Sequence, residues 1–529
     1  MEKTQNGKLA KAAMIVMSSI ILSRITGFLR VVLIPYRMGV SKTADAYNIA
    51  FLLPDLMFNL LVGGAIASAL IPVLSGYIEN KKEKEGWVSV SSFLNSIMLG
   101  IAVFCILGAI FTPQIIPVVA PGFKTKGIET QLLAINLTRV LFPSVSFLML
   151  AGLCNGVLNS YRRFASAAYG PCIYNLGSAA SIFIFGSKNA QDVQKVAYGV
   201  LASAFIYFVF QLVFTMKHLR FYKPSIHFKE RGFIELVKLA VPSLLSSSVV
   251  QLNVIISASF VTLFREGSYT AFKMADTVWQ LPYGIFAQGI GIAMLPTLSA
   301  SLAAGRKDEF KNLLEKGLRA VLLPAIPSAI GLIVLREPIL TAIFKWNANF
   351  NDSALPLTGS ILMLFSTALI TQSIVAVMNR GFYADNDTTT PLLVGIGTIV
   401  LNYVLGFTFV HLTGFEAAGM ALSYSIISLI NAVLLGFILK RRMKLSFKGI
   451  YIFALKVFAA AAIMGLTLYV FRFIPVHPGM KAVQLLLLGI EVFLGGLVFF
   501  AFSHVLKVDE VIRYSLGLKS KFKNKKKSY

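Results

Sequence analysis

Long apolar stretches alternate with short polar segments along the whole chain. Each stretch has about 20 residues or more, and at a rise of about 1.5 Å per residue such a helix crosses a hydrocarbon core of roughly 30 Å. The pattern therefore predicts an all-α polytopic membrane protein with about 14 transmembrane helices. The predicted spans are residues 12–38, 46–78, 89–112, 130–154, 163–187, 193–216, 232–264, 270–302, 314–335, 354–380, 388–411, 415–439, 449–471 and 482–506.

The composition excludes a single soluble domain. Hydrophobic residues make up 56% of the chain, charged residues only 14%, and the mean hydropathy is +0.75, whereas soluble domains are about one quarter charged. The formal net charge of +26 is in the range of proteins that bind nucleic acid. However, the basic residues occupy short loops and a tail from Lys519 to Lys527 instead of one folded face, so no nucleic-acid partner is expected. The tail is a topology signal or attracts anionic membrane lipids.

The distribution of Lys and Arg predicts the orientation of the chain. Basic residues near span ends are retained on the cytoplasmic side, and with the N-terminus inside, the cytoplasmic segments carry about three times as many as the outer loops. Both termini are therefore predicted to be cytoplasmic. Six further basic residues fall inside the predicted spans, namely Arg24, Arg30, Arg139, Lys238, Lys273 and Lys456. Lys238 and Lys456 lie close to cytoplasmic span ends, where snorkelling is the expected role.

Two halves of the chain repeat short motifs at an offset of about 220 residues. The matching motifs are Ile71-Pro72-Val73-Leu74-Ser75 with Leu295-Pro296-Thr297-Leu298-Ser299, Leu141-Phe142 with Leu364-Phe365, Asn159 with Asn379, and Pro171 with Pro391. This offset spans six helices and predicts parallel repeats about an axis along the membrane normal, an arrangement that suits a transporter with two rocking halves. The predicted organisation is an N-terminal six-helix lobe over 1–225, a C-terminal six-helix lobe over 226–445, two additional helices within 446–510 and a basic cytoplasmic tail over 511–529.

Charges inside the first, second and eighth spans predict an anion-binding cavity. A charge at bilayer depth costs at least about 2.5–3.5 kcal/mol, so it usually faces a polar cavity or a partner. The first span contains Arg24 and Arg30, and Asp45 at the start of the second is a candidate partner for one of them. Lys273 and Asp276 begin the eighth span on one helix face. Because arginine binds phosphate oxygens through two hydrogen bonds, an anionic headgroup is the expected ligand. The alternative is that these charges snorkel or set the topology.

A further set of motifs follows in order along nearly the whole chain. They are Ser23-Arg24, Gly27-Phe28, Arg30, Ala44-Asp45-Ala46-Tyr47-Asn48-Ile49-Ala50-Phe51, Leu53-Pro54, Gly64-Ala65, Ser68-Ala69, Ile71-Pro72-Val73-Leu74, Ala275-Asp276, Leu295-Pro296-Thr297-Leu298-Ser299 and Gly381-Phe382-Tyr383-Ala384. Together these motifs resemble the MurJ/MviN family of lipid II flippases, most specifically between Arg24 and Pro72.

The resemblance implies the fold of the multidrug/oligosaccharidyl-lipid/polysaccharide exporter superfamily, with two six-helix lobes and two further helices that accommodate a lipid tail. Family members move lipid II, the undecaprenyl-linked peptidoglycan precursor, from the inner to the outer leaflet of the bacterial cell membrane. The family's cavity residues correspond to Arg24, Arg30 and Asp45. The resemblance thus implies a transporter that needs no cofactor.

Several positions depart from the family pattern. Phe58 stands where an arginine is expected, Thr277 replaces the arginine of an Ala-Asp-Arg motif, and Val31 replaces a common acidic residue. Lys273 lies one helical turn before Thr277 and is a candidate substitute for the missing charge. These departures affect the expected substrate more than the expected fold.

Other function classes are less well matched. An enzyme acting on lipid-linked sugars needs an acid, base or metal cluster at a membrane face, and no such grouping is formed by His218, His227, His411, His477, His504, Cys105, Cys154 and Cys172. A drug antiporter of the same superfamily needs buried carboxylates for organic cations, whereas these spans contain more basic than acidic residues. A non-transporting membrane scaffold would not require cavity charges in two corresponding bundles. A flippase for another lipid-linked oligosaccharide remains an alternative function.

The sequence contains no phosphate-binding Gly-rich loop. The energy for transport is therefore expected from a coupling ion, the membrane potential or downstream consumption of the product.

Overall fold

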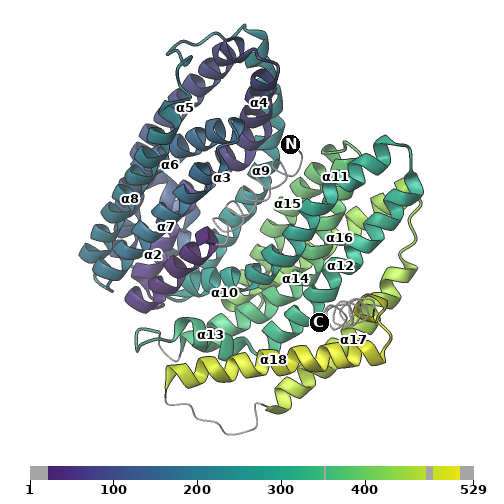
Figure 1. Ribbon diagram of the computed structural model, residues 1–529. Helices are drawn as coiled ribbons and strands as arrows, with labels where there is room; N and C mark the ends of the chain where they lie inside the picture. The colour runs from purple at the N-terminus through teal and green to yellow at the C-terminus, as the bar shows by residue number, and fades with distance from the viewer. Residues whose placement is uncertain (1–21, 351–352, 472–479, 513–529) are drawn as a thin grey trace, which may run out of the picture. The chain divides into compact units, whose positions relative to one another are not determined.

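The computed structural model describes residues 22–350, 353–471 and 480–512 (Figure 1). Within these ranges the chain forms helices joined by loops and turns, without a strand. The prediction of an all-α protein is confirmed. Contacts divide the chain into two compact units, the first ending at Thr270 and the second beginning at Ala271.

The first unit begins, within the described residues, with a helix over 22–38. The following elements are α2 (Lys42–Ala50), α3 (Leu52–Asn59), η1 (Leu60–Leu70), α4 (Ile71–Glu79), α5 (Glu83–Val119), η2 (Pro121–Phe123), α6 (Ile128–Ser160), α7 (Phe164–Phe185), α8 (Ala190–Met216) and α9 (Arg231–Val261). Polar side chains fix several starts: Ser41 accepts a hydrogen bond from the Ala44 amide at α2, and Asn189 accepts one from the Gln191 amide at α8.

The second unit includes most of α10 (Ser268–Pro282), whose first turn contains the boundary at Thr270. Its further elements are η3 (Tyr283–Gln288), α11 (Gly289–Ala303), α12 (Lys307–Val334), α13 (Arg336–Phe344), α14 (Ala354–Ala384), α15 (Thr389–Leu412), α16 (Glu416–Met443), α17 (Lys448–Phe471) and α18 (Lys481–Val505). Basic residues in the last turn of α16 complement the negative end of its helix dipole.

Eleven helical stretches in the described part of the chain are long and apolar enough to cross a membrane, and each coincides with a predicted span. The other three predictions fall on residues 12–38, of which 22–38 are described and helical, on 46–78, and on α7. The chain is therefore multi-pass as predicted, whereas the count of 14 spans is not confirmed and stays a prediction.

The second and eighth predicted spans both contain a π-helical stretch. The stretch η1 contains Ser68, four residues before Pro72, and η3 directly follows Pro282. A proline inside a helix lacks an N–H donor and its ring crowds the carbonyl four residues earlier, so a helix commonly kinks near it. The second span was predicted as one continuous helix, but the structure divides it into α2, α3, η1 and α4. The two π-helical stretches lie N-terminal to the motifs that define the predicted repeat.

Helix α9 packs against η1 and α5 of the first unit. The contact-based division thus falls one helix beyond the boundary predicted at residue 225. That boundary, and those at 445 and 510, describe the repeat and stay predictions. The predicted basic tail lies outside the described residues from residue 513 onward.

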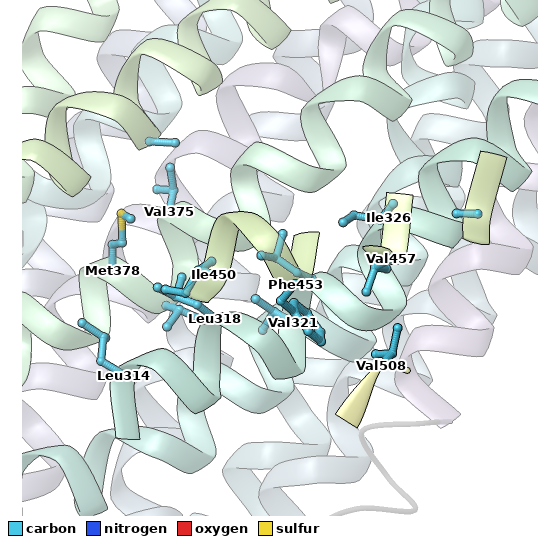
Figure 2. Packing of buried hydrophobic residues seen from close by; sticks show 14 of the residues in the cluster. Leu314, Leu318, Val321, Ile326, Val375, Met378, Ile450, Phe453, Val457 and Val508 are labelled. Carbon is cyan, nitrogen blue, oxygen red and sulfur yellow. The ribbon is translucent and has the colours of Figure 1, made fainter. Parts of the chain in front are cut away.

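The two helices beyond the predicted repeat belong to the second unit. Phe453 and Val457 of α17 lie in one buried cluster with Leu318 and Val321 of α12 (Figure 2). At the same interface Gly465 leaves room for α12, because a Cβ atom there would lie 2.6 Å from Ile330 Cγ2. Helices in a bilayer associate mainly through such close packing, since lipid tails are as apolar as the side chains.

The connection between α8 and α9, residues 217–230, is bound along the first turns of α5 and is called here the strap. Asn95 Nδ2 donates to the carbonyls of Lys223 and Ser225 at 3.0 and 2.9 Å. The amides of Lys223 and His227 donate to Ser91 Oγ and Ser92 Oγ at 3.1 and 3.0 Å. A long polar loop in the sequence is therefore a fixed segment in the structure.

The strap ends at Glu230, which caps α9. Its carboxylate accepts hydrogen bonds from Ser89 Oγ and, at 2.8 Å, from the Phe233 amide. Desolvation by burial opposes ionisation, but these hydrogen bonds outweigh it and lower the pKa of Glu230. The cap is therefore anionic at neutral pH and holds the start of α9 against α5.

Replacing Asn95 with alanine is expected to release the strap. The carbonyls of Lys223 and Ser225 would lose their donor, at a cost of about 1–3 kcal/mol for partly buried groups. Trypsin cleavage after Arg220 and Lys229 in detergent-solubilised protein should accelerate about tenfold or more. The matched control is Asn80→Ala, since Asn80 bonds only to Gly76 in its own exposed helix end. Equal cleavage rates for both variants would contradict a fixed strap.

Candidate substrate-binding site

The two arginines predicted in the first span lie on one continuous helix over 22–38 and have different surroundings. Arg24 is exposed and makes no ion pair or hydrogen bond with the residues that the structure describes. Arg30 is half-buried, with its guanidinium carbon 5.4 Å from the ring centre of Phe51 and 5.9 Å from that of Tyr174. Six residues give about 600° of rotation, so the two side chains leave the helix in different directions. The helix does not break at Gly27, where a bend seemed possible from the sequence.

Arg30 has partners that sequence reasoning missed. Besides Tyr174, Phe51 brings two further residues near the Arg30 guanidinium: Tyr47 packs against Phe51 with ring centres 4.8 Å apart, and Asp55 lies one turn after Phe51, with its amide donating to the Phe51 carbonyl at 2.8 Å. Tyr47 is only 1% exposed, and its hydroxyl has no hydrogen-bond partner in the described structure. Tyr47 stands in the motif that carries the family resemblance, but its 17-residue separation from Arg30 gives no indication of contact. A cation among aromatic rings is stabilised by about 0.5–2 kcal/mol per ring contact.

Asp45 forms an ion pair with a different residue from the one predicted. Its side chain is fully buried, and Lys126 Nζ lies 3.5 Å from Oδ2. The Gly267 amide donates to Oδ2 at 2.8 Å, and the amide and hydroxyl of Thr270 both donate to Oδ1 at 2.8 Å. Lys126 also donates to the Arg265 carbonyl at 3.1 Å. The idea that Asp45 pairs with an arginine of the first span is therefore wrong for this structure, whereas a contact of Asp45 with substrate stays a prediction.

Phe58, at the position of a missing family arginine, packs among apolar side chains. It lies with Tyr174 against a buried cluster that contains Leu148, Ala151 and Tyr207. An aromatic side chain suits this position, because a cation among these groups would need a counter-charge. Within the described first unit, the cations of the candidate site are therefore Arg24 and Arg30.

Lys273 and Asp276 lie on one face of α10, as predicted. Lys273 Nζ is 3.9 Å from Asp276 Oδ2, and their side chains are 42% and 21% exposed. Trp279 Nε1 and Gln280 Nε2 donate to Asp276 Oδ1 at 3.1 and 2.7 Å. The carboxylate is thus held by its own helix, while the lysine keeps an accessible ammonium group. A convergence of Lys273 with Arg24 and Arg30 on one cavity stays a prediction.

Arg380 of α14 is a second-unit cation that sequence reasoning placed at a span end. Its side chain is half-buried, and its guanidinium carbon lies 5.8 Å from the ring centre of Tyr383. Gly291 of α11 faces it, since a Cβ there would lie 3.6 Å from Arg380 Nε. The sequence feature that could have identified Arg380 is its position directly before the Gly381-Phe382-Tyr383-Ala384 motif.

The remaining predicted span charges lie outside this group. Arg139 and Lys238 are exposed, Arg139 Nε donates to the Ala109 carbonyl at 3.3 Å, and Lys456 Nζ donates to the Lys507 carbonyl at 3.2 Å. The three cysteines are buried and form no disulfide within the described residues. In the described ranges no group of three or more His, Cys, Asp or Glu residues is arranged to hold a metal ion.

Comparisons with known proteins agree on one family. The family described as lipid II flippase MurJ matches residues 34–489. A probable lipid II flippase MurJ of Buchnera aphidicola is 30% identical over 451 residues, covering 85% of this chain and 88% of the relative. The lipid II flippase MurJ of Burkholderia cenocepacia is 27% identical over 438 residues, covering 82% and 84%. The chain belongs to the MurJ family of lipid II flippases.

Two solved structures with similar folds support this assignment. A lipid II flippase MurJ in an inward closed conformation matches with a TM-score of 0.77 and 25% identity, covering 94% of this chain and 100% of that chain. An inward-facing multidrug resistance MATE family transporter matches with a TM-score of 0.67 and 16% identity, covering 82% and 98%. The second likeness concerns the fold alone. The recognition made from the motifs is confirmed, and the protein is a multi-pass membrane protein of this family.

If Lys273 replaces the arginine expected at Thr277, the charge should be movable between the two positions. We expect Lys273→Ala to lower lipid II translocation about tenfold, as for loss of one charged hydrogen bond. Adding Thr277→Arg should restore it, because Thr277 lies one turn along α10 and its hydroxyl already bonds to the Lys273 carbonyl at 2.8 Å. Initial translocation rates in reconstituted vesicles are the measurement. A silent Lys273→Ala would contradict the substitution.

Proposed function

We propose that this protein moves lipid II from the inner to the outer leaflet of the bacterial cell membrane by alternating access. The observation that carries the proposal is the exposed guanidinium of Arg24 on the helix that also holds Arg30, in a chain of the MurJ family. An unpaired cation at bilayer depth is costly unless it serves a polar cavity or an anion. The diphosphate of lipid II supplies such an anion.

The proposed chemistry is binding and release, without a covalent step. Arg24 and Arg30 leave their helix in different directions and would contact different oxygens of the diphosphate, with the two-pronged geometry that suits phosphate. Lys273 would add a point charge, with Asp276 keeping it oriented. Asp45 would support the site indirectly, because its hydrogen bonds fix the segment that leads into α10. No enzymatic activity and no cofactor are part of the proposal.

The proposed orientation places both termini in the cytoplasm, from the excess of basic residues in alternate loops. The prenyl tail would stay in lipid between helices while the headgroup crosses, with α17 and α18 as its neighbours. A coupling ion or the membrane potential would supply the energy. The membrane potential is worth about 2.3 kcal/mol per charge per 100 mV, which is sufficient to bias a cationic cavity.

Two alternatives use the same fold. A flippase for another lipid-linked oligosaccharide would meet the same diphosphate and would differ in the headgroup. A drug antiporter is favoured by the MATE neighbours only at the level of fold, and the exposed side chain of Arg24 disfavours an organic cation. The balance of charge in the candidate site therefore supports an anionic lipid-linked substrate.

Translocation in vesicles of purified protein tests the proposal. The vesicles receive, in separate experiments, labelled lipid II, an undecaprenyl-diphosphate-linked oligosaccharide without peptide, and a fluorescent organic cation. We expect protein-dependent movement of lipid II, detected by enzymatic modification of headgroups that reach the far leaflet. Preference for the peptide-free oligosaccharide would favour the first alternative. Movement of the organic cation alone would overturn the proposal.

A further inference from the structure

The side chains around Arg30 form a compact group from three segments of the first unit, called here the Arg30 cage. Phe51 and Tyr174 face the guanidinium at 5.4 and 5.9 Å. Asp55 of α3 lies one helical turn after Phe51, since its amide donates to the Phe51 carbonyl at 2.8 Å, and residues four apart share a helix face. Tyr47 of α2 packs against Phe51 with ring centres 4.8 Å apart. The Asp55 carboxylate forms no direct ion pair in the described structure, so it attracts the guanidinium without occupying its hydrogen-bonding edge.

We propose that Asp55 is the positioning counter-ion of Arg30, which holds this cation in the cage until a diphosphate takes over its charge. The inference rests on the proposed function and adds a residue to it that the family resemblance does not supply. The acidic residue expected beside Arg30 is Val31 in this chain. Asp55 provides a negative charge to the same guanidinium from another helix.

Of the two nearby acidic residues, Asp55 is the better candidate for the counter-ion of Arg30. Asp45 is fully buried and already bonded to Lys126, Gly267 and Thr270. Asp55 is half-buried, and within the described residues its carboxylate forms no hydrogen bond or ion pair. Its carboxylate is therefore available to balance Arg30. A half-buried cation without any counter-charge would be costly.

The Tyr47 hydroxyl supplies a second argument for an incoming anion. It is buried next to Phe51, whose ring faces Arg30, and has no hydrogen-bond partner in the described structure. A buried hydroxyl without a partner is destabilising, and an arriving acceptor removes that cost. A phosphate oxygen bound by Arg30 would be such an acceptor. Asp55 and the phosphate then compete for one cation, and this competition would help to release the substrate after it crosses.

The test compares Asp55→Asn with the wild-type protein by lipid II binding and by translocation. Removing the competing charge should tighten binding about tenfold, which corresponds to about 1.4 kcal/mol, and should slow translocation by a similar factor because release is slower. Undecaprenyl diphosphate, which lacks the headgroup, should show the same gain in affinity. The control is Glu129→Gln, whose 87% exposed carboxylate lies near Lys42 and outside the cage, and it should change neither quantity.

A double-mutant cycle with Arg30→Gln separates positioning from other effects. If Asp55 acts through Arg30, Asp55→Asn should change affinity less than twofold in the Arg30→Gln background. If Asp55→Asn alone fails to fold, adding Arg30→Gln should restore folded protein, since the uncompensated charge is removed. Unchanged or weaker binding by Asp55→Asn, or additive effects in the cycle, would overturn the inference. A wild-type protein that binds lipid II without moving it would overturn the proposed function and leave the affinity comparison intact.

Discussion

Replacing Arg24 with alanine is expected to reduce lipid II translocation about hundredfold while the protein folds and inserts normally. A charge-assisted hydrogen bond to phosphate is worth about 1.5–3 kcal/mol, and a loss near the upper end corresponds to two orders of magnitude. The fold should be unaffected because the exposed Arg24 side chain bonds to no described residue. Removing a charge at bilayer depth also lowers the cost of insertion. Translocation in vesicles and thermal unfolding in detergent are the two measurements.

The matched control for Arg24 is lysine at the same position. Arg24→Lys keeps the charge but cannot form the bidentate hydrogen bonds of a guanidinium group with phosphate. Translocation should therefore fall to an intermediate rate. A charge-only role would leave Arg24→Lys at the wild-type rate. Normal translocation by Arg24→Ala would show that this arginine is a snorkelling or topology charge, and the proposed headgroup site would then lose its most accessible cation.

The apolar pattern predicted the membrane-crossing helices well, because the thickness of a bilayer sets their length. The interruption of the second span at η1 was not predictable by length and hydropathy, although Pro72 marked its neighbourhood. The strap was also beyond prediction. Residues 217–230 read as a polar linker, and their attachment depends on Ser91, Ser92 and Asn95 more than 120 residues earlier.

For the candidate site, residue types were easier to predict than partners. Arg24, Arg30 and Asp45 were selected because charges inside apolar spans are rare. Which groups meet depends on tertiary packing: Lys126 approaches Asp45 from the loop before α6, and Arg30 faces the ring of Phe51, one turn before Asp55. No helical spacing connects residues this far apart. The pair in α10 was predictable because Lys273 and Asp276 are three residues apart on one helix.

Replacing Asp45 with alanine is expected to destabilise the protein more than any other single change considered for the site. The amides of Gly267 and Thr270 would lose their acceptor, and Lys126, whose side chain is only 6% exposed, would lose its carboxylate. Breaking a buried ion pair by removing one partner costs about 3–5 kcal/mol. The melting temperature should fall by about 5 °C or more. The buried thiols Cys105, Cys154 and Cys172 report unfolding through a thiol-reactive dye.

Two further variants decide whether Asp45 acts through the fold or through the substrate. Asp45→Asn keeps one carbonyl acceptor but loses the charge facing Lys126, so its melting temperature should lie between those of Asp45→Ala and the wild type. Asp308→Ala removes a carboxylate that is 92% exposed and should leave the melting temperature unchanged. If Asp45→Ala melts like the wild type yet fails to move lipid II, Asp45 acts in the substrate cavity, the place that the family resemblance implies for it. A lowered melting temperature, with translocation retained at low temperature, assigns Asp45 to holding the chain that enters α10.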